Sequence, residues 1–382
     1  MKRGGFILED MGIVCALGAD RETVRKRLAR RDTSGMARLE GLCGGDATFF
    51  GFAAGLPHPA SRTESAAVPG SPARIDAILE IAAAQIEESV AAAAAAVGRG
   101  RVGVAVGTSN STMEEFTDNP DKIDMAHPAE WIKRRFALGG PALAVSTACS
   151  SSAKSFAAAR RLIESGECDA VVTGGADAYT RTVVEGFHAL EALSGSLCRP
   201  LAPDRDGINL GEGAALFVMR RAEPRDETRR DTPLAVRLAG VGESSDAYHL
   251  TAPDPEGRGA EAAMRQALAE AGLAPSDIDF VNLHGTGTVY NDAMECAAAG
   301  RVFGVRRDAD GVGLADALAV RAFSTKALTG HCLGAAGAVE AALCWLELRE
   351  RPLSCLSNSF AFGGSNASLV LTSASKFRKI ST

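Results

Sequence analysis

The chain has 382 residues, of which 46% are hydrophobic and 23% are charged, with a mean hydropathy of +0.02. This balance excludes disordered, fibrous and membrane classes, and the net charge of -6 disfavours a nucleic-acid-binding surface. The nine cysteines include no CxxC pair, so neither a zinc site nor a disulfide framework is indicated. We therefore expect a soluble protein of the reducing cytoplasm that binds no metal.

The N-terminal residues are not expected to form a targeting or membrane segment. Met1 to Leu8 starts like a signal peptide, but Glu9 and Asp10 follow before a long apolar run develops. The longest apolar stretch, 90–97, is too short to cross a bilayer. The Pro- and Ser-rich run 56–74 predicts a surface loop, and the charged run 223–233 predicts a linker.

The same order of elements occurs on both sides of that linker: a helix, a strand, a Gly-Thr pair, a strand, a helix and a closing strand. In the first half these segments are 78–96, 102–106, 107–108, 142–145, 155–165 and 216–219. In the second half they are 259–271, 280–284, 285–286, 317–320, 337–349 and 369–371. The tetrapeptide Ala-Leu-Ala-Val stands at 142–145 and again at 317–320.

This repetition predicts a duplicated α/β unit. Its halves, 1–222 and 234–382, are expected to pack as one unit, with helices covering two sheets and the active site where the halves meet.

The first chemically informative residue along the chain is Cys149, in Val145-Ser-Thr-Ala-Cys-Ser-Ser-Ser152. It follows an apolar strand and precedes a helix whose buried stripe would include Phe156, Ala159 and Leu162. A thiol at a helix N-terminus faces unpaired N-H groups, which lower its pKa and favour a thiolate nucleophile. The alternative is that Cys149 is a small buried residue in a tight turn.

Two histidines lie at glycine-rich strand ends. His284 begins His-Gly-Thr-Gly-Thr, and His331 lies in Thr-Gly-His-Cys-Leu-Gly. Flanking glycines let backbone and substrate approach closely, and a strand-end imidazole points into the crevice where α/β proteins bind ligands. Either histidine alone is equally well read as a core residue. Together with Cys149, they predict a catalytic constellation.

Four ordered motifs resemble those of the β-ketoacyl-acyl-carrier-protein synthases, closest to the elongating group. They are Thr147-Ala-Cys-Ser-Ser151, His284-Gly-Thr-Gly-Thr288, the segment 326–337, and Asn358-Ser-Phe-Ala-Phe-Gly-Gly-Ser-Asn366. The likeness extends from Gly12 to the last strand. It implies the thiolase fold, in which two βαβαβαββ-type halves form an αβαβα five-layer sandwich, usually in a dimer.

The resemblance also implies a role for each motif residue. Cys149 would carry the acyl chain as a thioester, and His284 and His331 would bind the malonyl thioester carbonyl and promote decarboxylation. Lys326 would orient His331, and Glu340 would support the site from behind. The backbone N-H groups of Cys149 and Phe362 would form the oxyanion hole. The gating loop would comprise Ala361, Phe362, Gly363 and Gly364, with alanine where relatives have glycine.

Other departures concern the partner and the acyl pocket. Glu191 stands where relatives often carry an arginine that touches the carrier protein, and Asn110 stands where an apolar residue often lines the acyl pocket. An acidic carrier would still need a local basic patch, and binding would then weaken steeply with salt. The candidates for that patch are Lys122, Lys133, Arg134 and Arg205.

The implied function is an acyltransferase that performs decarboxylative Claisen condensation with malonyl-acyl-carrier protein, in fatty-acid, polyene or polyketide synthesis. No cofactor is expected beyond the phosphopantetheine of the acyl-carrier protein. The expected partners are that carrier and a second subunit, in a homodimer or in a heterodimer with a related synthase or chain-length factor. The alternatives are a non-condensing chain-length-factor-like subunit and a thiolase-like acyltransferase. Acyl chain length, saturation and pathway stay open.

Overall fold

A computed structural model describes residues 5–58, 73–113, 120–223, 226, 234–306 and 313–376. Most of the predicted surface loop 56–74 and of the predicted linker 223–233 therefore lies outside the described residues. Among the described residues, no helix combines the length and the apolar character needed to cross a membrane.

The main sheet of the described chain has ten strands in the order β11-β10-β12-β13-β9-β1-β8-β6-β4-β5. The first half contributes β1 (Phe6–Val14), β4 (Val102–Gly107), β5 (Ala142–Val145), β6 (Ala170–Asp177) and β8 (Gly213–Arg221). The second half contributes β9 (Val236–Ser245), β10 (Phe280–Asn282), β11 (Arg321–Phe323), β12 (Ser354–Phe360) and β13 (Ser365–Ser373). A three-stranded sheet contains β2 (Met36–Leu39), β3 (Thr48–Gly51) and β7 (Leu210–Gly211).

The helices of the first half are α1 (Arg21–Ala29), α2 (Arg74–Ala84), α3 (Glu87–Val97), α4 (His127–Arg135), α5 (Ser151–Glu164) and α6 (Arg181–Ala189). Those of the second half are α8 (Arg258–Ala271), α9 (Val289–Phe303), α10 (Lys326–Thr329) and α11 (Ala336–Glu350).

The strand order reads the same from both ends toward the β9-β1 junction, so the two halves repeat one topology. That junction is short, because β1 and β9 pair antiparallel over only three residue pairs, from Phe6↔Leu238 to Leu8↔Val236. The predicted duplication is therefore confirmed, and the sheet comprises two five-stranded parts that meet edge to edge.

Two local expectations are wrong. The second Ala-Leu-Ala-Val, 317–320, is not a strand, because β11 begins only at Arg321 and the preceding residues form a turn. The expected helix 78–96 is two helices, α2 and α3, separated at Gln85 and Ile86. The Gln85 side chain donates to the carbonyls of Ile13 and Ala19, which ties the break to β1 and the loop after it.

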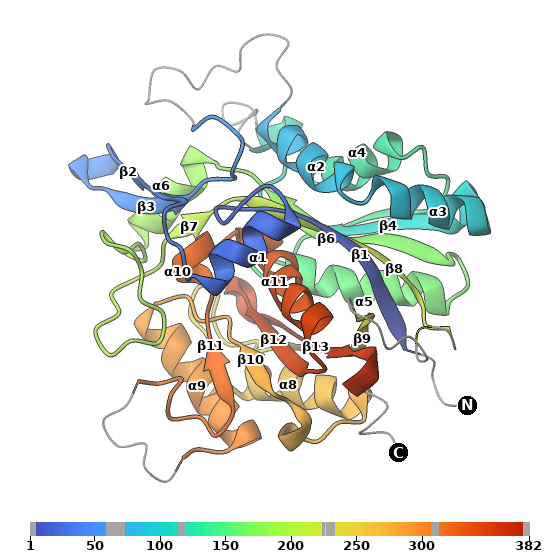
Figure 1. Cartoon of the computed structure of the whole chain (residues 1–382). Helices are drawn as coiled ribbons and strands as arrows, with labels where there is room; N and C mark the ends of the chain where they lie inside the picture. The colour runs from blue at the N-terminus through green and yellow to red at the C-terminus, as the bar shows by residue number, and fades with distance from the viewer. Residues whose placement is uncertain are drawn as a thin grey trace.

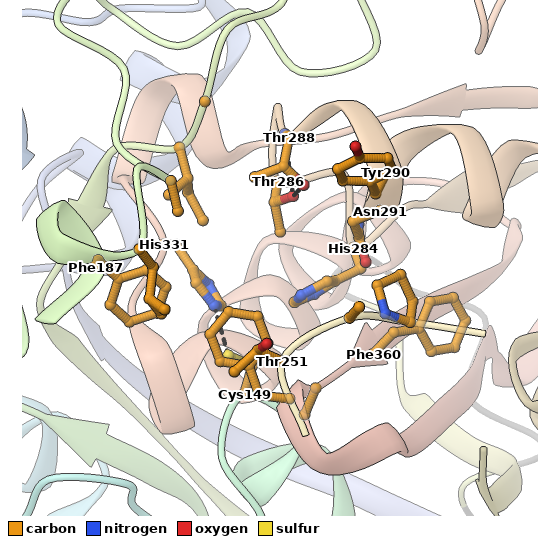
Figure 2. Close-up of a pocket in the computed structure, with 18 of the residues that line it drawn as sticks. Cys149, Phe187, Thr251, His284, Thr286, Thr288, Tyr290, Asn291, His331 and Phe360 are labelled. Carbon is orange, nitrogen blue, oxygen red and sulfur yellow. Dashed lines mark hydrogen bonds between the residues drawn. The ribbon is translucent and has the colours of Figure 1, made fainter. Parts of the chain in front are cut away.

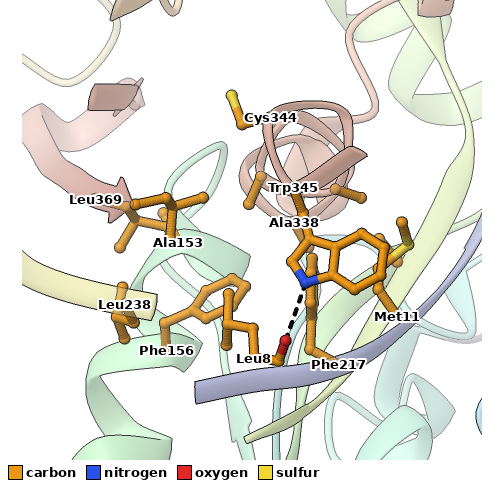
Figure 3. Close-up of a cluster of buried hydrophobic side chains, with 14 of the residues drawn as sticks. Leu8, Met11, Ala153, Phe156, Phe217, Leu238, Ala338, Cys344, Trp345 and Leu369 are labelled. Atoms are coloured by element: carbon orange, nitrogen blue, oxygen red, sulfur yellow. Dashed lines mark hydrogen bonds between the residues drawn. The ribbon is translucent and has the colours of Figure 1, made fainter. Parts of the chain in front are cut away.

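Five layers are visible in Figure 1: α2, α3 and α4 cover one part of the sheet, α5 and α11 lie in the middle, and α8 and α9 cover the other part. The middle layer holds the largest hydrophobic cluster, and Phe156 of α5 and Trp345 of α11 meet Leu8 of β1 there (Figure 3). The Trp345 Nε1 donates to the carbonyl of Leu8 at 3.0 Å. The predicted stripe Phe156, Ala159 and Leu162 is buried, which confirms the α5 register and the sandwich.

Candidate active site

The turn that carries Cys149 connects β5 to α5 and is held by its own serines. Ala148 has a φ of 51°, a conformation uncommon for a residue with a Cβ. The Ser151 hydroxyl accepts the Thr147 N-H at 2.9 Å and donates to the Ala148 carbonyl at 2.5 Å. The Ser150 hydroxyl contacts the Ser365 hydroxyl at 3.1 Å, which links this turn to the start of β13 in the other half.

The three residues singled out from the sequence come together between the halves. His331 Nε2 lies 2.9 Å from Cys149 Sγ, and the rings of His284 and His331 are 5.2 Å apart at 84°. Cys149 is 8% exposed, and both histidines are almost fully buried. Figure 2 shows the two rings converging on the sulfur from opposite sides of the pocket. This arrangement presents one nucleophile and two imidazoles to the same small volume.

Burial controls the protonation states of this group. It raises the pKa of the Cys149 thiol to about 12, against the opposing effect of the Lys326 charge. Burial and the same lysine hold the pKa of His284 and of His331 well below the ordinary value. The expected lowering of the Cys149 pKa by the helix N-terminus is therefore wrong in direction, because desolvation outweighs it. These shifts favour a neutral thiol beside a neutral His331 imidazole in the free site, with His331 Nε2 as the nearest acceptor for the thiol proton.

Lys326 contacts His284 and not His331, which differs from the expected pairing. Its ammonium donates to the His284 carbonyl and to Glu340, and lies 3.4 Å from His284 Nδ1. An ammonium can only donate, so Nδ1 must accept and the His284 proton sits on Nε2, the nitrogen free to donate. Glu340 is buried directly behind Lys326, as the sequence suggested.

Two buried carboxylates that the sequence reading missed hold the loop of His284. Glu295 accepts the N-H groups of His284 and Gly285, each at 2.8 Å, and the Asn358 side chain at 3.0 Å. Burial raises the pKa of Glu295 to about 7. Asp292, one turn earlier in α9, accepts the Gly287 N-H. The sequence did contain a signal for them, because Asp292 and Glu295 are spaced by three residues shortly after the motif His284-Gly-Thr-Gly-Thr288.

The loop proposed as a gate closes one side of the pocket. The Phe362 ring is partly exposed and stacks on Phe187 of α6, with centroids 5.6 Å apart. Ala361 is extended, with φ -110° and ψ 158°, whereas Gly363 has a φ of 74°. The contacts described for Phe362 do not test whether its backbone N-H belongs to the oxyanion hole, so the oxyanion-hole role of Phe362 stays a prediction.

Asn110 and Glu191, two positions where the sequence departs from the family pattern, lie in different environments. Asn110 is buried, donates to the Ala178 carbonyl and Thr180 hydroxyl, and is not among the residues that line the pocket. Glu191 is exposed and does line it.

A pocket of about 310 Å³ leads from Cys149 to the surface. Thr286, Thr288 and Thr251 place hydroxyls along it, and Tyr290 stands at its mouth with 80% of its surface exposed (Figure 2). The combination of a buried thiol and a pocket that connects it to the surface suits a thioester delivered on a slender arm.

The donor atoms of Cys149, His284 and His331 all lie within 4.8 Å of one another, which is also compatible with one metal ion. The Lys326 ammonium behind His284 disfavours a divalent cation there, because like charges repel strongly at a buried site. The same geometry favours hydrogen bonding to a carbonyl oxygen.

Comparison with protein families gives two matches in series. The model "Beta-ketoacyl synthase, N-terminal domain" matches residues 71–225, and "Beta-ketoacyl synthase, C-terminal domain" matches residues 235–358. The interval between the two matches, 226–234, overlaps the predicted linker 223–233.

Similar curated proteins include Nodulation protein E of Rhizobium leguminosarum bv. trifolii, with 37% identity over 260 residues, covering 61% of each chain. The 3-oxoacyl-[acyl-carrier-protein] synthase 2 of Coxiella burnetii is 32% identical over 323 residues, covering 71% of this chain and 75% of the relative. The match to the nodulation protein thus spans about three fifths of its length.

Among solved structures, the ketosynthase (ApeO) in complex with its chain length factor (ApeC) from Xenorhabdus doucetiae matches with a TM-score of 0.83. The identity is 35%, and the match covers 97% of this chain and 98% of that one.

Proposed function

Since the chain belongs to the β-ketoacyl synthase family, we propose that it is an acyltransferase that condenses a Cys149-bound acyl group with malonyl-acyl-carrier protein. The product would be a β-ketoacyl-acyl-carrier protein, and carbon dioxide would leave. The observation that carries this proposal is the buried Cys149 thiol, 2.9 Å from His331 Nε2 and beside His284.

The first step is acyl transfer to Cys149. As the sulfur attacks the carbonyl of the incoming thioester, its proton passes to His331 Nε2, the atom already placed to accept it. The C-S bond to the carrier's phosphopantetheine then breaks, and the departing thiolate takes the proton from His331. Backbone N-H groups of Cys149 and Phe362 are proposed to stabilise the oxyanion.

The second step is decarboxylative condensation. The Nε2-H of His284, whose tautomer Lys326 imposes, donates to the malonyl thioester carbonyl. His331 donates to the same carbonyl after its own proton has moved from Nδ1 to Nε2, once Cys149 is acylated and no longer presents a thiol proton to Nε2. The bond between the malonyl C2 and its carboxylate breaks, carbon dioxide leaves, and the electron pair forms an enolate. C2 then bonds to the acyl carbonyl carbon, the bond from that carbon to Cys149 Sγ breaks, and the departing thiolate takes a proton from water.

The proposed substrates are carried on the phosphopantetheine of an acyl-carrier protein, and no other cofactor takes part. A solved neighbour of similar fold, AntDE:AntF, is described as a ketosynthase with its acyl-carrier protein, and ApeO is solved with a chain length factor. We propose that this chain likewise works with a carrier and pairs with a second family subunit, as a homodimer or heterodimer.

Two rival functions fit the site less well. Chain-length-factor-like subunits replace the nucleophile, whereas this chain keeps Cys149 at the base of an open pocket. A thiolase-like enzyme needs a second catalytic cysteine, but Cys332 is buried and its sulfur faces the Glu212 carbonyl at 3.5 Å. Cys332 also does not line the pocket, whereas Cys149 does.

Intact-protein mass spectrometry after incubation with a panel of acyl-carrier thioesters tests the proposal. One acyl mass should appear on Cys149, none should appear on Cys149→Ala, and Cys332→Ala should load normally. Malonyl-carrier should then release the acyl group as a β-ketoacyl product. His284→Ala and His331→Ala should each slow condensation by about 10² to 10⁴-fold while leaving residual acyl transfer. Acyl label on Cys168 or Cys332 would contradict the assignment.

A further inference from the structure

The mouth of the pocket is surrounded by exposed apolar side chains. Of the eight large hydrophobic side chains exposed in the described part of the chain, six lie there. We call them the apolar rim: Leu190, Tyr248, Leu250, Val289, Tyr290 and Phe362. Four of them line the pocket, and Tyr248 and Leu250 belong to the segment whose Asp246, Thr251 and Ala252 also line it. Exposed apolar side chains gathered around one opening mark an interaction site.

The apolar rim is continuous with the loop beside Cys149. The Leu250 carbonyl accepts the Gly363 N-H at 2.7 Å, and the Phe362 side chain is itself part of the rim. A partner seated on the rim would therefore contact the loop proposed to admit the acyl chain.

The charge at this mouth is negative. The residues that line the pocket include Glu191, Asp206 and Asp246, and none of them is lysine or arginine. The nearby Arg205 was expected to bind the carrier, but its side chain is only 9% exposed. It donates to the carbonyls of Ala202, Thr288 and Val289, so it holds the backbone at the pocket mouth in place and is not free to bind a carrier.

The other expected cations lie elsewhere. Lys122 is in a short turn (Pro120–Lys122), and Lys133 and Arg134 are on α4 in the outer helix layer over β4 and β5. None of the three lines the pocket. The expected basic patch is therefore absent from the mouth within the residues that the structure describes.

We propose that the apolar rim docks the carrier protein through apolar contacts rather than through ion pairs with acidic carrier residues. This inference rests on the proposed function. A substrate tethered to a carrier reaches Cys149 only if the carrier sits over this mouth, and acidic carrier side chains opposite Glu191 and Asp206 would be repelled. The matching carrier surface is apolar, with neutral or basic residues at its border. Apolar burial is not screened by salt.

The test compares one acyl group on two vehicles. Octanoyl-pantetheine reports the chemistry of Cys149 alone, and octanoyl-carrier reports chemistry plus docking, with the carrier chosen as the fastest from a panel of purified acyl-carrier proteins. The rim variant is Tyr248→Ser combined with Leu250→Ser, since neither side chain lines the pocket. The matched control is Val305→Ser, which removes an apolar side chain that is 59% exposed away from the pocket.

For the rim variant, the ratio of carrier-borne to pantetheine-borne loading rates should fall about tenfold or more, as expected for losing two apolar contacts. Val305→Ser should keep the wild-type ratio. The wild-type carrier rate should change less than about threefold between about 50 and 300 mM NaCl.

A ratio unchanged in the rim variant, a steep fall with salt, or a carrier that loads no faster than pantetheine would each overturn the docking proposal. Failure of octanoyl-pantetheine itself to load wild-type Cys149 would instead overturn the proposed function.

Discussion

At the scale of single residues, the site depends on one buried charge and its neighbours. The Lys326 ammonium is enclosed by the His284 carbonyl, His284 Nδ1 and Glu340. Glu340 supplies the compensating negative charge, although burial raises the pKa of its carboxyl. Lys326 therefore has two effects: it selects the His284 tautomer, and its positive charge favours the neutral forms of His284 and His331.

Replacing Glu340 with glutamine should destabilise the fold strongly. The change leaves Lys326 buried without a counter-charge, which lowers the free energy of unfolding by about 3–5 kcal/mol. Glu347→Gln on the same helix is the control, because the Glu347 side chain is 39% exposed and lies 3.8 Å from Arg351, whose side chain is 66% exposed. That exposed pair should contribute less than about 1 kcal/mol. Urea unfolding measures both, and equal losses would show that burial does not matter here.

The reactivity of Cys149 should rise steadily with pH. With a thiol pKa raised to about 12, the thiolate fraction grows about tenfold per pH unit throughout the range from about 7 to 10. The rate of alkylation by iodoacetamide at Cys149, mapped by mass spectrometry, should follow that slope. The alkylation rate of free cysteine in the same solution should reach a plateau once the pH exceeds the ordinary pKa of a thiol. A plateau for Cys149 below about pH 9 would mean that the helix N-terminus outweighs burial.

At the scale of elements, the depth of Cys149 is set by how closely α5 packs on the sheet. A Cβ on Gly107 of β4 would lie 2.2 Å from the Ser152 backbone nitrogen, and one on Gly175 of β6 would lie 2.5 Å from the Ser152 Cβ. The Ser152 hydroxyl in turn accepts the Ala338 N-H of α11 at 2.9 Å. Two glycines therefore allow the first turn of α5 to contact both the sheet and the facing helix.

Gly107→Ala should force α5 away from the sheet. We expect a loss of about 1–3 kcal/mol in the free energy of unfolding from overpacking, together with a changed alkylation rate at Cys149. Gly186→Ala is the matched control, because that glycine is within α6 and a Cβ there meets no atom within 4 Å. It should gain about 0.5–1 kcal/mol in stability. A Gly107→Ala variant as stable as Gly186→Ala would refute the close approach.

The loop 361–364 gives a second prediction at this scale. Glycine at position 361 has access to backbone angles closed to alanine, so Ala361→Gly should let Phe362 swing aside and speed acyl loading of Cys149. Alkylation by a small reagent should not change. Rapid-quench measurement of both rates decides the question. Equal loading rates in wild type and variant would mean that Ala361, already at ordinary extended angles, does not limit entry.

At the scale of the whole molecule, the two halves share one core. Trp345 of the second half packs with Leu8, Met11 and Phe217 of the first, and its indole donates to the Leu8 carbonyl (Figure 3). Because the Cys149 turn comes from one half and both histidines come from the other, this middle layer also holds the catalytic groups in register.

Unfolding should therefore be a single transition for both halves. Trp345→Ala should lower the free energy of unfolding by about 3–5 kcal/mol. The circular dichroism transition and the fluorescence of Trp131, which lies on α4 at the outer layer of the first half, should shift together. A Trp131 midpoint left in place while the circular dichroism midpoint moves would mean that the halves unfold independently.

What the sequence determined by itself was mainly local and periodic. The alternation of strands and helices shows the duplication, and Gly272, with a φ of 66°, ends α8 where the sequence predicts. Cys149 and His284 are identifiable because each lies in a short motif between a strand and a helix. His331, which was expected at a strand end, instead follows the short helix α10 and precedes α11, and its glycine-rich motif made it identifiable. Helix periodicity and caps depend on neighbours within a few residues, which explains why such features are readable without coordinates.

Only the tertiary structure decided the protonation states of Cys149 and the two histidines and the character of the surface around the pocket mouth. Lys326 contacts His284 across 42 residues of sequence, and Cys149 meets His331 across 182. The Cys149 pKa rises because segments from both halves bury the thiol, and Arg205 leaves the surface because it binds carbonyls of α9 and the loop before it. Desolvation and charge pairing depend on which distant segments pack together, and no local pattern contains that information.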